Sequence, residues 1–196
     1  VGGGAAAVIS VIEFTAGYVS SIPMLTATIF TVVIGSVSFT GSMLTFAKLQ
    51  ELMTSRPVVL PFGRFITIGV AVGTVATTVL LIANPTNTLL WLLLGLSLFL
   101  GILLVLPVGG ADVPIVISLL NAFTGLAVAA SGYVLGNVLL IVAGTLVGAA
   151  GTLLTRMMAK AMGRPLTNTL FGAFTAKAST AVASAEDRPV KSASPE

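Results

Sequence analysis

Residues 113 to 135 read VPIVISLLNAFTGLAVAASGYVL, a run of 23 residues without a charged side chain. A helix needs about 20 predominantly apolar residues to cross the hydrocarbon core of a bilayer, and this run is long enough. Its apolar residues do not alternate with polar ones, so the run is typical of a helix and not of a strand in a membrane barrel. We therefore predict a transmembrane helix here.

Asn121 is the residue of greatest functional interest within this run. It lies nine residues after Asp112, which follows Gly109 and Gly110, so a helix would carry its side chain about 13 Å into the membrane. A carboxamide at that depth needs hydrogen-bonding partners and usually faces the bundle interior or a wet cavity. Asn121 is therefore a candidate for an ion or proton path. An interhelical hydrogen bond that only fixes packing is an equal alternative.

The composition predicts that most of the chain lies in a membrane. Of its 196 residues, 56% are hydrophobic and 8% are charged, and the mean hydropathy is +1.12. Ordinary soluble domains do not have such values. Breaks that contain proline, glycine or asparagine separate the apolar runs. We predict an all-α fold, a polytopic bundle of six transmembrane helices, over residues 1–20, 25–52, 65–83, 88–108, 113–135 and 139–162.

The basic residues fall on one side of this predicted topology. Lys48, Arg56 and Arg64 lie in or beside the connection between the second and third helices. By the positive-inside rule, that connection, the C-terminal tail and, because the helix count is even, the N-terminus are cytoplasmic. The net charge of +3 is therefore explained by topology and does not indicate nucleic-acid binding. The other basic residues all lie at or after the end of the sixth helix: Arg156, Lys160, Arg164, Lys177, Arg188 and Lys191.

Both ends of the chain suggest a piece of a longer protein. Val1 leads directly into three glycines without an initiator methionine or a basic segment, so we expect a truncated first helix and no signal peptide. From Thr175 the chain is rich in alanine and serine, which is typical of a flexible linker. We therefore expect a transmembrane helical domain over residues 1–174 and a flexible cytoplasmic linker over residues 175–196.

Small residues one helical turn apart predict close helix packing. Such pairs let helix backbones approach each other in lipid, and packing is their commonest meaning. They occur at Gly69 and Gly73, at Gly132 and Gly136, and at Gly144 and Gly148.

Two stripes of small and polar residues are predicted, one on the second helix and one on the fifth. The first consists of Gly35, Ser38, Ser42 and Thr45, and the second of Ser118, Asn121 and Gly125. Each set falls on one helical face. Two such stripes in one bundle can line a shared hydrated route. Serine and threonine also bond readily to carbonyls of their own helix, which is the structural alternative.

The sequence lacks the residues of several common active sites. It contains no histidine, no cysteine and no phosphate-binding loop, so we predict no metal site, no catalytic nucleophile and no nucleotide cradle in this chain. The chain is therefore not expected to be an enzyme by itself. Asp112 begins the fifth predicted helix, where a carboxylate can cap free N–H groups and complement the helix dipole.

A set of motifs resembles one known family. The motifs are FTGS (39–42), FAKL (46–49), SRP (55–57), GGADVP (109–114) and SLLN (118–121). Together they resemble the membrane domain of proton-translocating nicotinamide nucleotide transhydrogenase, in its β-subunit portion. The stretches 139–148 and 160–164 extend the resemblance, which covers residues 1 to about 174.

This resemblance implies a complex in which hydride passes from NADH to NADP⁺ on separate peripheral domains while this domain conducts a proton inward. The chain would be the membrane part of that enzyme, with no catalytic residue and no cofactor of its own, while NAD(H) and NADP(H) bind the partner domains. The implied partners are the α-subunit membrane helices, the two nucleotide-binding domains and the lipid bilayer. A dimer of the complex in a bacterial cytoplasmic membrane is expected.

The resemblance also implies roles for individual residues. Asn121 and Ser42 would line the proton path, and Ser118 joins them because it shares the predicted stripe. Asp112 and Arg164 would lie at the cytoplasmic face toward the NADP(H) domain. The close-packing positions would be Gly125, Gly132 and Gly151, and Gly148 joins them because of its pair with Gly144.

The protonatable member of the relay is not among these residues. In the family an ionisable histidine, or an asparagine in some members, precedes the segment that matches Val1 and Gly2. Neutral Asn121 cannot store a proton at physiological pH, so it can only hold water or support a partner. Two other functions remain open at this point: a helical scaffold or anchoring subunit, and a small-solute transporter.

Overall fold

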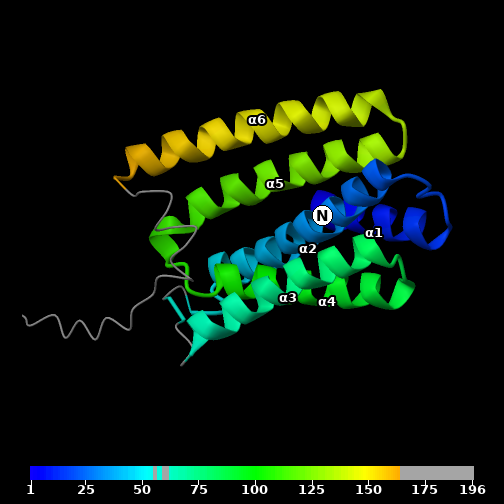
Figure 1. Ribbon diagram of the computed structural model, residues 1–196. Coiled ribbons are helices and arrows are strands. Elements are labelled where there is room, and N and C mark those ends of the chain that lie inside the picture. The colour runs from blue at the N-terminus through cyan, green and yellow to red at the C-terminus, as the bar shows by residue number, and fades with distance from the viewer. Residues whose placement is uncertain (55–56, 59–61, 164–196) are drawn as a thin grey trace, which may run out of the picture.

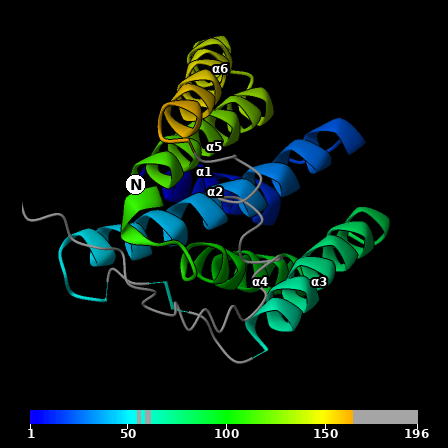
Figure 2. The same cartoon turned by 90° about the vertical axis from the view of Figure 1, so that its left-hand side faces the viewer.

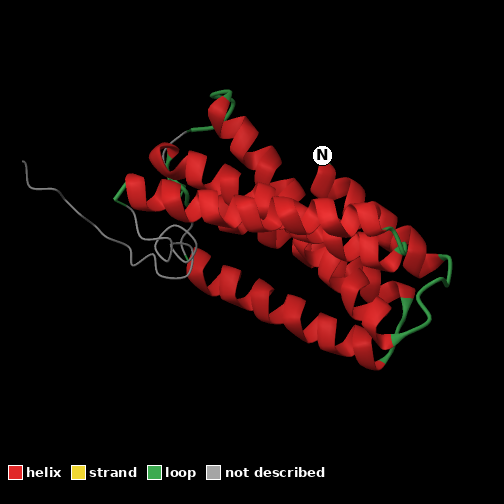
Figure 3. Ribbon diagram, turned by 90° about the horizontal axis from the view of Figure 1, so that it is seen from above, coloured by secondary structure: helices red, strands yellow, loops and turns green. Residues whose placement is uncertain are grey.

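The computed structural model describes residues 1–54, 57–58 and 62–163. In this part of the chain every regular element is a helix, as Figure 3 shows. Arg164 and the expected linker over residues 175–196 lie outside the described residues. The elements are α1 (Gly2–Thr15), α2 (Ile22–Leu49), α3 (Gly63–Ala83), α4 (Asn87–Val105), the short 3-10 helix η1 (Gly110–Asp112), α5 (Val113–Val134) and α6 (Val138–Ala161).

Five of these helices, α2 to α6, are long and apolar enough to cross a membrane. The chain is therefore an integral membrane protein, and the predicted all-α bundle is confirmed. The first helix differs from the prediction. With 14 residues, α1 is about 21 Å long, which is shorter than the hydrocarbon core of about 30 Å.

Gly17 explains why α1 ends at Thr15 and not at residue 20. Its φ angle is +78°, a left-handed conformation that glycine adopts without a steric penalty. The N–H of Gly17 donates to the carbonyl of Phe14, and the N–H of Tyr18 donates to that of Glu13. This pair of bonds is a Schellman motif, which satisfies the last helical carbonyls and turns the chain away.

The helices are arranged around α2. It contacts α1, α4 and α5, while α6 packs on α5 and α3 packs mainly on α4. Figures 1 and 2 show the pair α5 and α6 on one side of α2 and the pair α3 and α4 on the other. The bundle therefore has three layers, with α1 and α2 in the middle one.

The two ends of the bundle differ in their side chains. Lys48, Arg64 and Lys160 lie at the end where α2 and α6 finish and α3 begins, which we call the basic end. The opposite end carries the exposed side chains of Tyr18, Trp91 and Tyr133, and we call it the aromatic end. Aromatic side chains of this kind are typical of membrane–water boundaries.

Glycine contacts hold α5 against α6 at backbone distance. A Cβ atom added to Gly125 would lie 2.6 Å from the backbone nitrogen of Gly148, and one added to Gly144 would lie 2.6 Å from the carbonyl oxygen of Gly125. The pair on α3 behaves differently. A Cβ at Gly69 would meet nothing within 4 Å, and one at Gly73 would meet only Leu96, at 3.9 Å. This pair makes no close helix contact within the described part of the chain.

Candidate functional site

Three helices meet at Gly3. A Cβ atom there would lie 3.0 Å from the carbonyl oxygen of Gly35, 3.1 Å from the Cβ of Ser38 and 3.2 Å from Oγ1 of Thr124. The first turn of α1 therefore sits in the groove between α2 and α5. Figure 1 shows this start of α1 near the middle of the bundle's length.

Ser42 and Asn121 lie at one level, on the side of Gly3 that faces the basic end. The helices α2 and α5 are antiparallel: Oγ1 of Thr31 donates to the carbonyl of Ala127 at 3.4 Å, and a Cβ at Gly41 would lie 3.1 Å from Leu120. Ser42 follows Ser38 by one turn on α2, and Asn121 precedes Thr124 by one turn on α5. Because the two helices are antiparallel, Ser42 and Asn121 both lie nearer the basic end than Ser38 and Thr124.

Both of these side chains are accessible. Ser42 and Asn121 are exposed, whereas the neighbouring positions Gly41 and Ala122 are buried. Ser42 lies one turn from Ser38 on α2, and Asn121 lies one turn from Thr124 on α5. Ser38 and Thr124 both border the first turn of α1. Two exposed hydrogen-bonding side chains thus lie about one turn from the contact of Gly3 with α2 and α5, toward the basic end.

Ser118 is placed differently from Asn121. Its side chain is 8% exposed and lies between α5 and α6. Oγ1 of Thr155 donates to Oγ of Ser118 at 2.9 Å, and Oγ of Ser118 donates to the carbonyl of Gly151 at 3.5 Å. The predicted stripe on α5 is therefore divided: Ser118 and Gly125 face α6, and Asn121 is exposed.

The four glycines predicted as close-packing positions all lie where α5 and α6 touch. A Cβ at Gly132 would lie 2.7 Å from Cβ of Leu140, one at Gly148 would lie 2.8 Å from Cδ2 of Leu126, and one at Gly151 would lie 2.9 Å from Cβ of Ala122. Gly125 makes the contact with Gly148 described above. Ser118 belongs to this same interface.

Buried hydroxyl groups line the contact between α1 and α2. Ser10, Ser36 and Ser38 are each 1% exposed, and their Oγ atoms have no hydrogen-bond partner among the described residues. Ser10 follows Gly3 by two turns and so lies on the same face of α1. A buried hydroxyl without a protein partner is a position where ordered water is expected.

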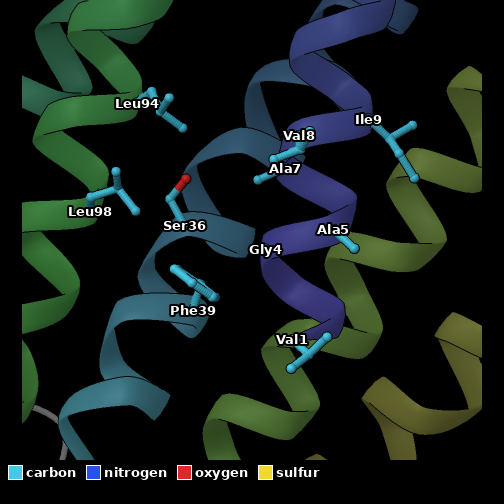
Figure 4. Close-up of a pocket in the computed structure, with 10 residues that line it drawn as sticks. All are labelled: Val1, Gly4, Ala5, Ala7, Val8, Ile9, Ser36, Phe39, Leu94 and Leu98. Carbon is cyan, nitrogen blue, oxygen red and sulfur yellow. The ribbon is translucent and has the colours of Figure 1, made fainter.

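A hollow of about 580 Å³ lies beside this contact. Ser36 is one of the lining residues, and its hydroxyl oxygen, which lies between Leu94 of α4 and Ala7 of α1 (Figure 4), is buried and adds no polar surface to the hollow. The other lining residues are apolar or glycine, and Ser42, Asn121 and Ser118 are not among them. An apolar surface of this kind does not hold a continuous water chain, so the hollow is distinct from the predicted polar route.

Asp112 occupies the N-cap position of α5, but its side chain does not make the cap hydrogen bond. The residue closes η1 through its backbone, whose N–H donates to the carbonyl of Gly109 at 2.9 Å. Its carboxylate remains close to the positive end of the α5 dipole. The predicted capping bond is therefore not part of its role in this structure.

Lys48 has a structural role that its sequence position alone does not indicate. We assigned it only to topology, yet its side chain is 2% exposed and is the largest fully buried one in the described chain. Its Nζ donates to the carbonyls of Val105, Leu106 and Val108 at 3.0, 2.6 and 2.8 Å. The spacing of Lys48 from Gly41 and Thr45 is the feature of the sequence that could have indicated its burial. These three residues share a helical face, and Gly41 and Thr45 are also buried.

Comparison with known proteins identifies the family. The family model described as the NAD(P) transhydrogenase beta subunit matches residues 1–196. The chain belongs to this family. Two relatives named NAD(P) transhydrogenase subunit beta, both from Rhodospirillum rubrum, are each 40% identical to it over 165 residues. That match covers 83% of this chain.

The resemblance drawn from the motifs is thereby confirmed at the level of the family. The chain spans 36% of the length of these beta-subunit relatives. The positions of Ser42, Asn121 and Lys48 are therefore those of one membrane portion of a beta subunit.

Proposed function

We propose that this chain is the proton-conducting membrane part of an NAD(P) transhydrogenase. In this proposal, proton movement through the bundle is coupled to hydride transfer from NADH to NADP⁺, which takes place on separate peripheral domains. NAD(H) and NADP(H) bind those domains and supply the redox chemistry. The observation that carries the proposal is that Ser42 and Asn121 are both exposed and lie one turn from Ser38 and Thr124, which border the first turn of α1.

The chemistry of these two side chains suits a water-filled route. A serine hydroxyl and a carboxamide both donate and accept hydrogen bonds, so they can hold and orient water without taking up a charge. Neither changes its protonation state near neutral pH. A protonatable group on another segment or subunit is therefore part of the proposal, and it would approach Ser42 and Asn121 along the line of α1.

The unpartnered hydroxyls of Ser38 and Ser10 extend this route toward the aromatic end. They lie on the α1–α2 contact, Ser38 at the level of Gly3 and Ser10 two turns beyond it, in the direction opposite to Ser42. Water molecules at these positions would form hydrogen bonds with both hydroxyls and would extend the route from Asn121 toward the aromatic end. Ser118 is a weaker candidate for the route, because its hydroxyl is already bonded between α5 and α6.

The basic end would face the cytoplasm and the NADP(H)-binding domain. The positive-inside rule supports this orientation, since Lys48, Arg64 and Lys160 lie at that end. Asp112 and Arg164 are the proposed coupling residues there. The proposed partners are the α-subunit membrane helices and both nucleotide-binding domains, within a dimeric complex of a bacterial inner membrane.

Reconstitution of the full complex tests this function. Proteoliposomes that contain the complex, NADH and NADP⁺ should acidify or alkalinise their lumen as nucleotide is reduced, and a proton ionophore should abolish the pH change. An imposed pH gradient should in turn alter the rate of NADP⁺ reduction. A scaffold or a small-solute transporter predicts neither effect, so nucleotide reduction without linked proton movement would refute the proposal.

A further inference from the structure

The Lys48 ammonium group ends in a cage of backbone carbonyls. Its three acceptors, Val105, Leu106 and Val108, lie at the end of α4 and in the segment just after it. A lysine ammonium has three N–H donors, and each has an acceptor in this cage. The side chain thus bridges from the last turn of α2 to a different helix and the connection that follows it.

The end of α4 is a favourable place for this charge. The last carbonyls of a helix have no partners within the helix and carry the negative end of its dipole. Lys48 donates to two carbonyls at this end, those of Val105 and Leu106, which also accept from the backbone N–H groups of Val108 and Val58. Around them, Val105, Val108, Val116 and Leu120 form an apolar cluster with Leu44 and Phe123, which shields the bonds from competing solvent.

The bonds also tie α2 to the connection that leads from α4 into α5. Lys48 lies six residues after Ser42 on α2, and its acceptor Val108 lies four residues before Asp112, where α5 begins. A displacement of Val108 toward or away from the basic end must therefore either carry α2 with it or break the Lys48 bonds, and η1 begins two residues after Val108. The α5 helix that starts at η1 carries Asn121.

We infer that Lys48 is a positioning residue that fixes the α4–α5 connection to α2 and so keeps Ser42 and Asn121 in register. The inference rests on the proposed function, because register matters only if both side chains serve one route. A residue that merely stabilises the fold would lower the amount of active complex without changing the number of protons moved per hydride transferred. That ratio therefore distinguishes positioning from simple stabilisation.

The test compares Lys48→Met with Lys160→Met in the full complex, reconstituted in proteoliposomes. Methionine keeps most of the length of the stem and removes the three donors. Lys160 is a matched control, since it also lies in the last turn of a helix at the basic end but is exposed. We expect Lys48→Met to lower the ratio of protons to hydride by about two-fold or more, while Lys160→Met keeps the wild-type ratio.

An unchanged ratio in assembled Lys48→Met complex would overturn the inference while leaving the proposed function in place. If Lys48→Met does not assemble, Lys48→Gln, which removes the charge and cannot supply three N–H donors, takes its place under the same criterion. Failure of both variants to assemble would mean that Lys48 serves folding alone, which also overturns the positioning role. Wild-type complex that moves no protons would instead remove the proposed function, and the inference with it.

Discussion

The backbones of Gly3 and Gly35 are in direct contact. A Cβ atom at Gly35 would lie 2.5 Å from the carbonyl oxygen of Gly3 and 3.2 Å from the Cβ of Ala7. Separations below 3.0 Å are essentially never found for real Cβ atoms. The position of α1 between α2 and α5, and hence the space beside Ser42 and Asn121, depends on the absence of a side chain at residue 35.

Gly35→Ala should therefore destabilise the bundle. The added methyl group must push α1 away from α2, and overpacking of this kind typically costs about 1–3 kcal/mol. Thermal unfolding of the purified complex in detergent measures the loss. Gly69→Ala is the matched control, because a Cβ there would meet nothing within 4 Å. Equal stability of the Gly35→Ala variant and the control would contradict the observed contact.

Much of the fold follows from hydrophobic runs and their breaks. The predicted spans of α2 to α6 agree with the observed ones within three residues at each end. The end of α1 was predicted five residues too late, because Gly17 stops the helix through backbone bonds that hydropathy does not report. The length and apolar content of a segment thus determine whether it can cross the membrane, while the backbone hydrogen bonds of the turn that follows determine where the helix ends.

The candidate site was less predictable, because it depends on which helices are neighbours. Ser118 and Asn121 are three residues apart and differ by about 60° around a helix, which is enough for one to face α6 and the other to be exposed. The sequence indicates a polar face but not the helix that covers it. The three acceptors of Lys48 are backbone carbonyls, which no side-chain pattern can reveal.

Removal of the Thr155 hydroxyl should affect stability more than coupling. Oγ1 of Thr155 bridges Ser118 and the carbonyl of Gly151, and hydrogen bonds between helices in a membrane are worth about 0.6 kcal/mol on average. Thr155→Val, which keeps the shape, should lower the free energy of unfolding by roughly this amount and leave the ratio of protons to hydride unchanged. A changed ratio would show that the hydroxyls between α5 and α6 belong to the proton route.

Asp112→Asn tests the charge of Asp112 separately from its shape. Asparagine has nearly the same shape and is as good an N-cap residue as aspartate, so the substitution should change thermal stability by less than about 1 kcal/mol. If the carboxylate couples the bundle to the NADP(H) domain, proton-linked turnover should fall severely in the same variant. Both quantities are measured on one preparation, and wild-type turnover would remove Asp112 from the coupling mechanism.

Cysteine labelling tests the proposed orientation. Thr54 follows the end of α2 at the basic end, and Thr86 precedes α4 at the aromatic end. Single cysteines at these positions should react with a membrane-impermeant maleimide from opposite sides of sealed vesicles, Thr54→Cys from the cytoplasmic side. Reaction of both from the same side would contradict the arrangement of α3 across the membrane.

Asn121→Leu in the full complex tests the central claim most directly. Leucine has a similar volume but cannot hold water, so proton-linked transhydrogenation in proteoliposomes should fall steeply if Asn121 lies on the route. Nucleotide exchange on the peripheral domains that does not require protons should continue, which shows that the complex has assembled. Asn121→Gln, which keeps a carboxamide, should retain more proton-linked activity than Asn121→Leu. Proton pumping by Asn121→Leu at the wild-type rate would contradict the proton route and leave Asn121 with a packing role only.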